Sequence, residues 1–182
     1  MTPIKDVKTM IQAFAFAKEQ VPSIKLWIMG PENEDETYSR ECHALVQSLH
    51  LSDVEFTGRV NVTDYLGRMD FTLLTSISEG QPLTVLEGFA AKKPAITTDV
   101  GSCRDLIYGG EGDTFGMAGI LCHIMNIGEI ANAIVELATH PQEREKYGEA
   151  GFERVKKYYR SEQLTERYRE IYDSIAEKYG KK

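Results

Sequence analysis

Two glutamates, Glu79 and Glu87, lie eight positions apart in the stretch SISEGQPLTVLEGFAAKKPAITTDVG, residues 76–101. On one uninterrupted helix, two turns would bring both carboxylates to the same face, as general acid and base chemistry could use. Pro82 stands between them, and proline is tolerated in the first turn of a helix but not in its interior. We therefore expect a helix to begin at Pro82, with Gln81 in the capping position and the two carboxylates on either side of the helix start.

The expected helix start is suited to binding a phosphate group. The backbone N–H groups of Leu83, Thr84 and Val85 would lack partners within the helix, and the aligned peptide dipoles make this end positive. Gly80 would let a ligand approach the backbone closely, and Thr84 adds a hydroxyl group. Glu87, about one turn deeper, would suit a neutral, hydroxyl-rich group such as a ribose better than a phosphate.

Each of these residues also has an ordinary explanation when it is taken alone. Glu79 could be a loop acid and Glu87 a solvated helix residue. Gly80 and Pro82 could be simple turn residues. Their joint arrangement at the end of a strand is what favours a binding site.

The chain around this stretch alternates between short apolar runs and amphipathic helical patterns. Strands are expected at residues 23–29, 53–58, 70–76, 94–99 and 118–123. Helices are expected at residues 7–20, 37–50, 62–68, 82–91, 102–108, 127–139, from 141 onwards and 162–179. This order predicts an α/β fold: a doubly wound, Rossmann-like parallel sheet with right-handed crossovers, helices on both faces and a helical C-terminal tail.

Ligands of open parallel sheets bind beyond the carboxyl ends of the strands. The residues expected at those ends are Gly30, Pro31, Gly58, Arg59, Val60, 76–80, 98–101 and His123. The loop that carries Glu79 is therefore expected at the binding edge of the sheet, beside the loop that follows the next strand.

Composition excludes several classes of protein. The 182 residues carry a formal net charge of -7 and no basic stripe, which argues against nucleic acid as a partner. No run of about eighteen apolar residues could span a membrane, and the N-terminus lacks a secretory signal pattern. The three cysteines have no CxxC spacing, which favours a reducing, cytoplasmic compartment over a disulfide framework.

His43, Gln47 and His50 share a helix face, but two histidines without a carboxylate do not predict a metal site.

The segment EGQPLTVLE resembles the E-x7-E motif of the retaining GT-B glycosyltransferases of family 4, also described as glycosyl transferases group 1. LWIMGPENED, VEFTGRVNVTDYLGRMDFTLLTS and TTDVGSCRDLIYGG resemble further segments of that family in the same order, so the resemblance covers most of residues 4–145. The sequence departs from the family pattern at Gly88 (usually alanine), Lys93 (usually glycine) and Asp105 (usually glutamate). Within the family, IKDVKT and GSCRDLIYG resemble the branch that makes Pel-type exopolysaccharide.

The resemblance implies the C-terminal, nucleotide-sugar-binding half of a two-domain enzyme. We therefore expect residues 1–182 to form one domain, with an α/β core over residues 1–145. Residues 146–182 would supply C-terminal helices that pack toward an N-terminal half absent from this chain. Because the first helix begins close to Met1, the chain is also expected to start just inside its first strand.

The resemblance also implies roles for single residues. Glu79 would lie near the donor sugar and Lys5 would neutralise the diphosphate, which makes these two the expected catalytic residues. Glu87 would accept hydrogen bonds from the ribose hydroxyls, and Thr84 would lie near the diphosphate. The remaining donor-binding residues are Gly80, Gln81, Pro82 and Leu83 at the sugar and distal phosphate, Arg59 and Val60 at the base, and Gly30 beside the nucleotide.

The activity implied is transfer of a hexose from a nucleoside-diphosphate sugar, with UDP favoured, to a saccharide acceptor in polysaccharide biosynthesis. The family retains the anomeric configuration and needs neither a cofactor nor a divalent metal. The full-length enzyme is expected in the cytoplasm, with peripheral contact to the inner face of the membrane, and this chain alone is expected to be inactive.

Two other interpretations remain open. One is an epimerase of UDP-GlcNAc with a similar fold, which would need further acids and histidines around the sugar. The other is a non-catalytic, Rossmann-like binding or scaffolding domain. An E87A variant separates a nucleotide site, which should lose affinity, from a scaffold, which should be unaffected.

Overall fold

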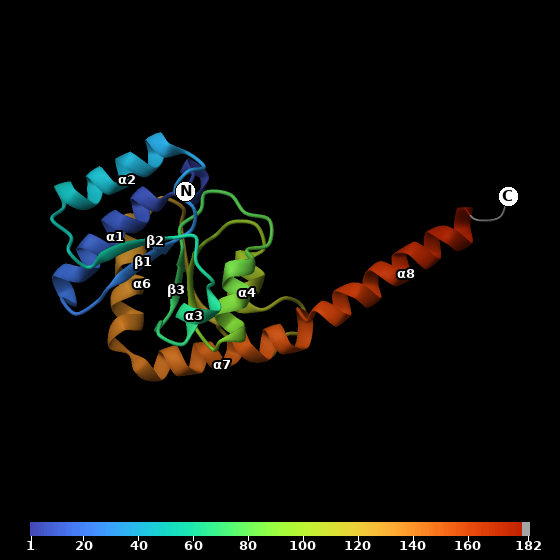
Figure 1. Ribbon diagram of the computed structural model, residues 1–182. Helices are drawn as coiled ribbons and strands as arrows, with labels where there is room; N and C mark the ends of the chain where they lie inside the picture. The colour runs from blue at the N-terminus through green and yellow to red at the C-terminus, as the bar shows by residue number, and fades with distance from the viewer. Residues whose placement is uncertain (180–182) are drawn as a thin grey trace.

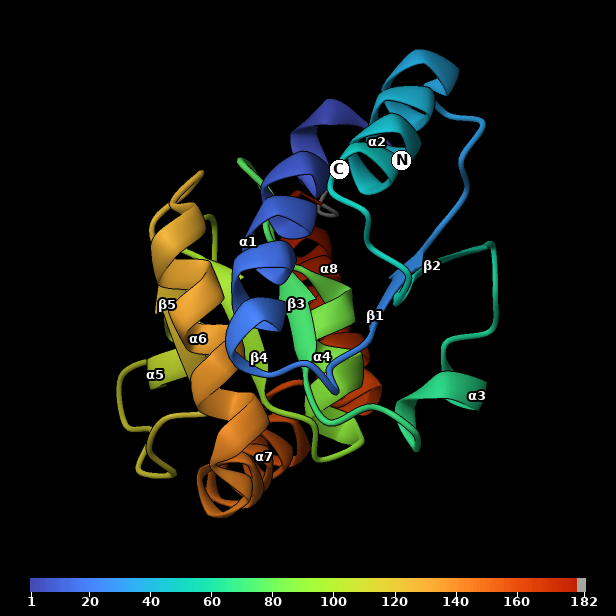
Figure 2. The same ribbon diagram turned by 90° about the vertical axis from the view of Figure 1, so that its left-hand side faces the viewer.

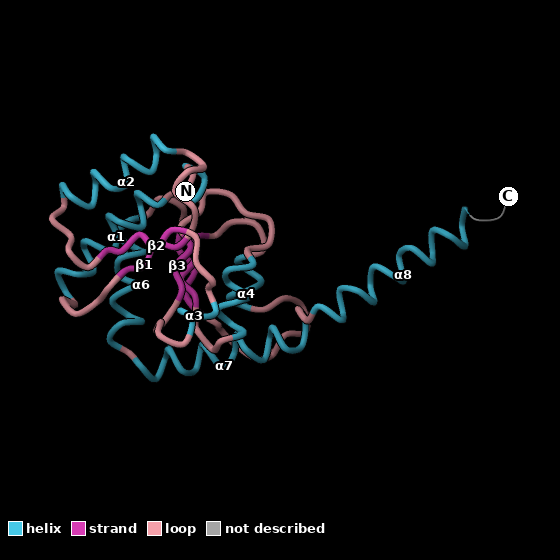
Figure 3. Tube along the Cα trace, in the orientation of Figure 1, coloured by secondary structure: helices cyan, strands magenta, loops and turns pink. Residues whose placement is uncertain are grey.

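The computed structural model describes residues 1–179, except for the side chain of Leu164, and shows an α/β body from which the last helix projects (Figure 1). The strands are β1 (Leu26–Met29), β2 (Val54–Gly58), β3 (Thr72–Leu74), β4 (Ala95–Thr98) and β5 (Gly119–Cys122). The helices are a 3₁₀ turn η1 (Pro3–Lys5), α1 (Val7–Gln20), α2 (Glu36–Ser48), α3 (Thr63–Leu66), α4 (Leu83–Ala90), α5 (Cys103–Tyr108), α6 (Ile127–Thr139), α7 (Pro141–Tyr158) and α8 (Ser161–Tyr179). Strand and helix alternate along the trace as the sequence predicts (Figure 3).

All strand pairings are parallel, which confirms the predicted α/β fold class. The strands form two hydrogen-bonded groups, β1 with β2, and β4 between β3 and β5. The first residues of the chain join these groups at their carboxyl ends. The ammonium group of Met1 donates to the Pro31 carbonyl, and the Ile77 N–H donates to the Ile4 carbonyl at 2.9 Å. The sheet expected from the sequence is thus divided where residues 1–4 lie between its two parts.

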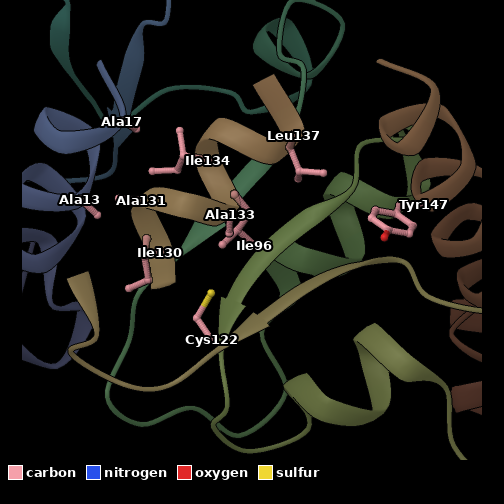
Figure 4. Packing of buried hydrophobic residues seen from close by; sticks show 10 residues of the cluster. All are labelled: Ala13, Ala17, Ile96, Cys122, Ile130, Ala131, Ala133, Ile134, Leu137 and Tyr147. Atoms are coloured by element: carbon pink, nitrogen blue, oxygen red, sulfur yellow. The ribbon is translucent and has the colours of Figure 1, made fainter. Parts of the chain in front are cut away.

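Helices cover both faces of the β3–β5 group. On one face α1 and α6 lie side by side (Figure 2), and on the other α4 and α5 pack with α7 behind them. Neighbouring residues of β4 point to opposite faces, so Ile96 packs toward α1 and α6 while Ala95 packs toward α4. The cluster on the first face comprises Ala13, Ala17, Ile96, Cys122, Ile130, Ala131, Ala133, Ile134, Leu137 and Tyr147 (Figure 4).

Glycines let α4 approach its neighbours closely. A Cβ atom at Gly151 of α7 would lie 2.6 Å from the Phe89 ring, so only glycine allows α7 to pack this near to α4. A Cβ atom at Gly88 would lie 2.9 Å from Thr72 Cγ2 of β3. This contact gives a physical reason for glycine at a position where alanine is usual in the family that the sequence resembles.

A buried ion pair fixes α7 to the body. The Arg154 side chain is 1% exposed, and its Nε and Nη2 atoms donate to the Asp113 carboxylate at 2.7 and 3.0 Å. Arg154 Nη1 also donates to the Leu106 carbonyl at 2.8 Å. Burial raises the pKa of Asp113, but the hydrogen bonds and charge of Arg154 more than offset this effect, so the pKa lies below its ordinary value. The expected boundary near residue 145 therefore falls inside α7, a helix that belongs to the body.

The last helix, α8, projects from the body, and every residue from 165 to 179 is exposed (Figure 1). Its large apolar side chains recur at helical spacing on one face. They are Tyr168, Ile171, Tyr172, Ile175 and Tyr179. Within residues 1–179, none of the helices combines the length and the apolar character that crossing a membrane requires. The end of the expected C-terminal segment, residues 180–182, lies outside the described residues.

Replacing Arg154 by methionine should lower the free energy of unfolding by about 3–5 kcal/mol, because Asp113 would keep a buried charge without its partner. Urea denaturation measures the loss. A matched control on the same helix is E143Q, which removes the exposed Lys146–Glu143 pair (Nζ–Oε2 3.7 Å) and should cost less than about 1 kcal/mol. If R154M were as mild as this control, the ion pair would not be what fixes α7.

Candidate functional site

The N-terminal residues are fastened to the end of β3 at the carboxyl edge of the sheet. The buried Thr75 hydroxyl lies 3.0 Å from both the Lys5 and the Asp6 carbonyl oxygens and donates to this pair. Asp6 has a left-handed backbone (φ 46°), which aspartate tolerates better than most residues, and this turn leads the chain into α1. Together with the Ile77–Ile4 hydrogen bond, these contacts hold the Lys5 backbone next to the loop that carries Glu79.

The loop after β4 holds the same loop from its other side. The Ser102 N–H donates to the Gly80 carbonyl at 2.9 Å, and the Thr98 hydroxyl donates to the Ser76 carbonyl at 2.6 Å. Gly101 lies between them with φ +52°, and a Cβ atom there would be 2.2 Å from the Glu79 carbonyl oxygen. Glycine at this position therefore permits the two loops to touch.

Lys5 and Glu79 form an ion pair at this edge. The Lys5 Nζ atom lies 2.7 Å from Glu79 Oε1, with side chains that are 49% and 14% exposed. Burial raises the pKa of Glu79, but the hydrogen bond from Lys5, the nearby Ser76 hydroxyl and the lysine charge more than offset this effect, so the pKa is lowered. The two expected catalytic residues are thus brought together, and Glu79 is a carboxylate at neutral pH.

The helix after this loop begins one residue later than the sequence predicts. Pro82 is the capping residue of α4 and has an extended backbone (φ −75°, ψ 108°), so Leu83, not Pro82, is the first helical residue and Gln81 does not cap. The Pro82 carbonyl accepts the first bond from the Val85 N–H at 3.2 Å, so this amide is not free as expected. The N–H groups of Leu83 and Thr84 have no acceptor among residues 1–179, and both residues are exposed. The positive, open helix end that the sequence predicts is present with two free amides.

The other expected donor-binding residues lie around this edge without contacting the ion pair. Glu87 and Arg59 are exposed, and neither forms an ion pair or side-chain hydrogen bond with any described residue. Val60 is half-buried after β2. Gly30 (φ +135°) donates its N–H to the Gly58 carbonyl at 2.9 Å, and a Cβ atom at Gly30 would meet nothing within 4 Å. The space beside Gly30 is therefore open.

Several buried oxygens of this edge have no partner. They are Asp6 Oδ2, Ser76 Oγ, Thr97 Oγ1 and Ser102 Oγ, none of which has a hydrogen bond with a described residue. The Ser76 hydroxyl is close enough to Glu79 to favour the charged carboxylate but does not reach hydrogen-bond geometry with it. Unsatisfied buried polar groups are few in folded proteins and call for an explanation where they occur. Here they come from the segments that build the candidate site.

Two of the four histidines, His43 and His123, are each paired with a glutamate. His43 Nε2 lies 2.6 Å from Glu32 Oε2 and its ring packs on Phe56, while His123 Nδ1 lies 2.9 Å from Glu129 Oε2. In the part of the chain that the structure describes, no three His, Cys, Asp or Glu side chains are grouped as a metal site would require.

A hollow of about 180 Å³ lies away from this edge, at the junction of α7 and α8. Gly110, Asp113, Arg154 and Tyr158 are among its lining residues. Arg154 and Asp113 bond each other, and Arg154 also bonds nearby carbonyls, so these two lining residues are already engaged within the protein.

Sequence reasoning missed the residues that position the site. Thr75 lies in a run that otherwise predicts only a strand, and nothing in the sequence indicates which carbonyls its hydroxyl would meet. Gly101 was the more accessible signal, since a glycine between a strand end and a short helix often marks a close backbone approach.

Replacing Gly101 by alanine should lower the free energy of unfolding by about 1–3 kcal/mol, because the new methyl group would press on the Glu79 carbonyl and force the loops apart. Thermal or urea denaturation measures the effect. The matched control is G67A, because Gly67 has an ordinary backbone (φ −64°) and a Cβ atom there would meet nothing within 4 Å. Equal stability of the two variants would mean that the loop contact is not tight.

Comparison with known proteins identifies the family of the chain. The model of the family described as "Glycosyl transferases group 1" matches residues 1–154. N-acetyl-alpha-D-glucosaminyl L-malate synthase of Bacillus anthracis is 32% identical over 174 residues, which is 94% of this chain but only 43% of that enzyme. The chain therefore spans less than half the length of this curated relative.

Two solved structures share the fold. The Anabaena protein Alr3699/HepE in complex with UDP-glucose superposes with a TM-score of 0.84 at 19% identity, over 96% of this chain and 46% of that one. The C-terminal domain of a glycosyl transferase group 1 family protein (LpcC) from Francisella tularensis gives a TM-score of 0.76 at 21% identity, over 88% of this chain and 83% of that one. These likenesses confirm the predicted Rossmann-like fold.

Proposed function

The chain belongs to the glycosyl transferases group 1 family, and we propose that it is the donor-binding domain of a retaining glycosyltransferase. In this proposal the enzyme moves a hexose from a UDP-sugar to a saccharide acceptor. The observation that carries the proposal is the Lys5–Glu79 ion pair (2.7 Å) held next to the open first turn of α4. This edge offers positive charge for a diphosphate and a carboxylate for sugar hydroxyls at the same place.

The diphosphate binds between Lys5 and the start of α4. The lysine ammonium supplies a full charge, and the free N–H groups of Leu83 and Thr84 supply a positive helix end. The exposed Thr84 hydroxyl adds a donor, and Gly80 lets the phosphate approach the backbone through the turn formed with Gln81 and Pro82. This arrangement is fixed before the ligand arrives, since hydrogen bonds from the neighbouring loops hold it.

The sugar and the nucleoside bind on either side of the diphosphate. Glu79, kept charged by Lys5, accepts hydrogen bonds from the donor sugar. Glu87 is exposed and free of protein partners among the described residues, so it can accept bonds from the ribose hydroxyls. The base lies against Arg59 and Val60, and the open space at Gly30 accommodates the nucleotide.

Transfer passes through an oxocarbenium-like state while negative charge grows on the leaving phosphate. Lys5 and the start of α4 stabilise that charge by preorganised electrostatics, which needs no divalent metal and no cofactor. The configuration at the anomeric carbon is retained, as in the family that the motif resembles. The UDP-glucose complex of the Anabaena protein supports UDP as the nucleotide.

The acceptor binds to the rest of the enzyme. The chain covers 43% of the Bacillus anthracis relative, so in this proposal acceptor contacts come from sequence outside this chain. The exposed apolar stripe of α8 packs against that part. The isolated chain therefore binds donor weakly and does not turn over. The full-length enzyme acts in the cytoplasm, peripherally at the inner face of the membrane, in the synthesis of a Pel-type exopolysaccharide.

The two other interpretations are less well supported. An epimerase would need additional acids and histidines around the sugar, but His43 and His123 are each engaged by a glutamate, at 2.6 and 2.9 Å. A scaffolding domain would not need an ion pair beside an open helix end.

Isothermal titration calorimetry with UDP, UDP-glucose, GDP and ADP tests the proposed function. UDP and UDP-glucose should bind, and E87A should weaken their binding by about 1–3 kcal/mol because the ribose hydroxyls lose a charged partner. The matched control is E145A, which removes an exposed glutamate of α7 that forms no ion pair within the described part of the chain and should leave affinity unchanged. A folded chain that binds none of these nucleotides would contradict the proposal, and affinity unchanged in E87A would favour a scaffold.

A further inference from the structure

We propose that Glu79 is the resting counter-ion of Lys5, so that the Glu79 carboxylate and a nucleoside diphosphate compete for one ammonium group. This inference rests on the proposed function, because it takes the ligand of the edge to be a nucleoside diphosphate. It adds that the ion pair lowers the affinity of the site for the free nucleotide and eases release of that product.

The geometry of the pair supports a real competition. Glu79 Oε1 lies 2.7 Å from Lys5 Nζ, and no other described carboxylate comes within ion-pair distance of that ammonium group. The Glu79 side chain is only 14% exposed, so water screens this pair less than a pair on the open surface. A phosphate that binds the Lys5 ammonium group must therefore displace the Glu79 carboxylate from it.

The exchange involves side chains and leaves the backbone in place. The Thr75 hydroxyl holds the Lys5 carbonyl, and the close contact of Gly101 holds the Glu79 backbone. The Lys5 side chain is 49% exposed, so its ammonium group has room to turn from Glu79 toward the start of α4. The carboxylate left behind is partly buried and needs a new hydrogen-bond donor.

The nucleotide sugar and the free nucleoside diphosphate differ in whether they bring a hydrogen-bond donor for the released Glu79 carboxylate. A nucleotide sugar brings hydroxyl groups that can bond the released carboxylate, whereas UDP has no sugar beyond its distal phosphate. Glu79 therefore opposes binding of UDP more than binding of UDP-glucose. After transfer, the carboxylate recovers Lys5 as UDP departs.

Calorimetry with UDP on the wild type, E79Q, K5M and the double variant tests this inference at low ionic strength. E79Q keeps the side-chain shape and removes the charge, so it should bind UDP about twofold to tenfold more tightly than the wild type, as expected for loss of a partly buried ion pair. K5M should bind UDP more weakly, and E79Q should have no further effect in the K5M background. For UDP-glucose, E79Q should bring no such gain.

The control is E149Q, which removes the Lys92–Glu149 pair (Nζ–Oε2 2.6 Å, side chains 53% and 52% exposed) at the far end of α4 and should leave UDP affinity unchanged. E79A serves as a second variant if E79Q does not fold, as thermal denaturation would reveal. Equal or weaker binding of UDP by E79Q, with the wild type binding, would overturn this inference and leave the proposed function standing. Failure of every variant and of the wild type to bind UDP or UDP-glucose would overturn both.

Discussion

The contact of Gly101 with the carbonyl groups of Glu79 and Gly80 is the constraint on which the carboxyl edge of this protein depends. A Cβ atom at residue 101 would lie only 2.2 Å from the Glu79 carbonyl oxygen. Glycine at this position therefore allows the loops after β3 and β4 to lie as near to each other as they do. This spacing permits the Ser102–Gly80 hydrogen bond. It also sets the position of Glu79 and of the loop that leads into α4. Thr75 performs the corresponding task on the other side by holding the Lys5 backbone.

The positive groups at the carboxyl edge contrast with the negative net charge of the whole chain. The formal net charge is -7, which disfavours anions at long range, so any anion site must be local and must combine several positive groups. One ammonium group and the open end of α4 supply such a site, and the lysine is already partly neutralised by Glu79. The positive charge of Lys5 therefore becomes available to an anionic ligand when that ligand displaces the Glu79 carboxylate.

Sequence reasoning recovered what depends on local pattern. The bounds 7–20 and 127–139 agree with α1 and α6 to the residue, because amphipathic periodicity and flanking signals set both. The edge that carries Glu79 follows from the rule that parallel sheets bind ligands at the carboxyl ends of their strands. The position of Pro82 indicates the start of α4, although Pro82 is the capping residue and not the first helical one. What depends on distant partners was not predicted: Arg154 and Asp113 are 41 residues apart in sequence, and the sheet divides where residues 1–4 lie between its parts.

A titration of the ¹⁵N-labelled chain with UDP, followed by amide NMR shifts, tests most directly whether this edge binds a nucleoside diphosphate. The largest shifts are predicted for the backbone amides of Gly80, Gln81, Leu83 and Thr84, with smaller ones at Lys5. Shifts gathered instead around the hollow beside Arg154, or no shifts at millimolar UDP from a folded chain, would contradict it.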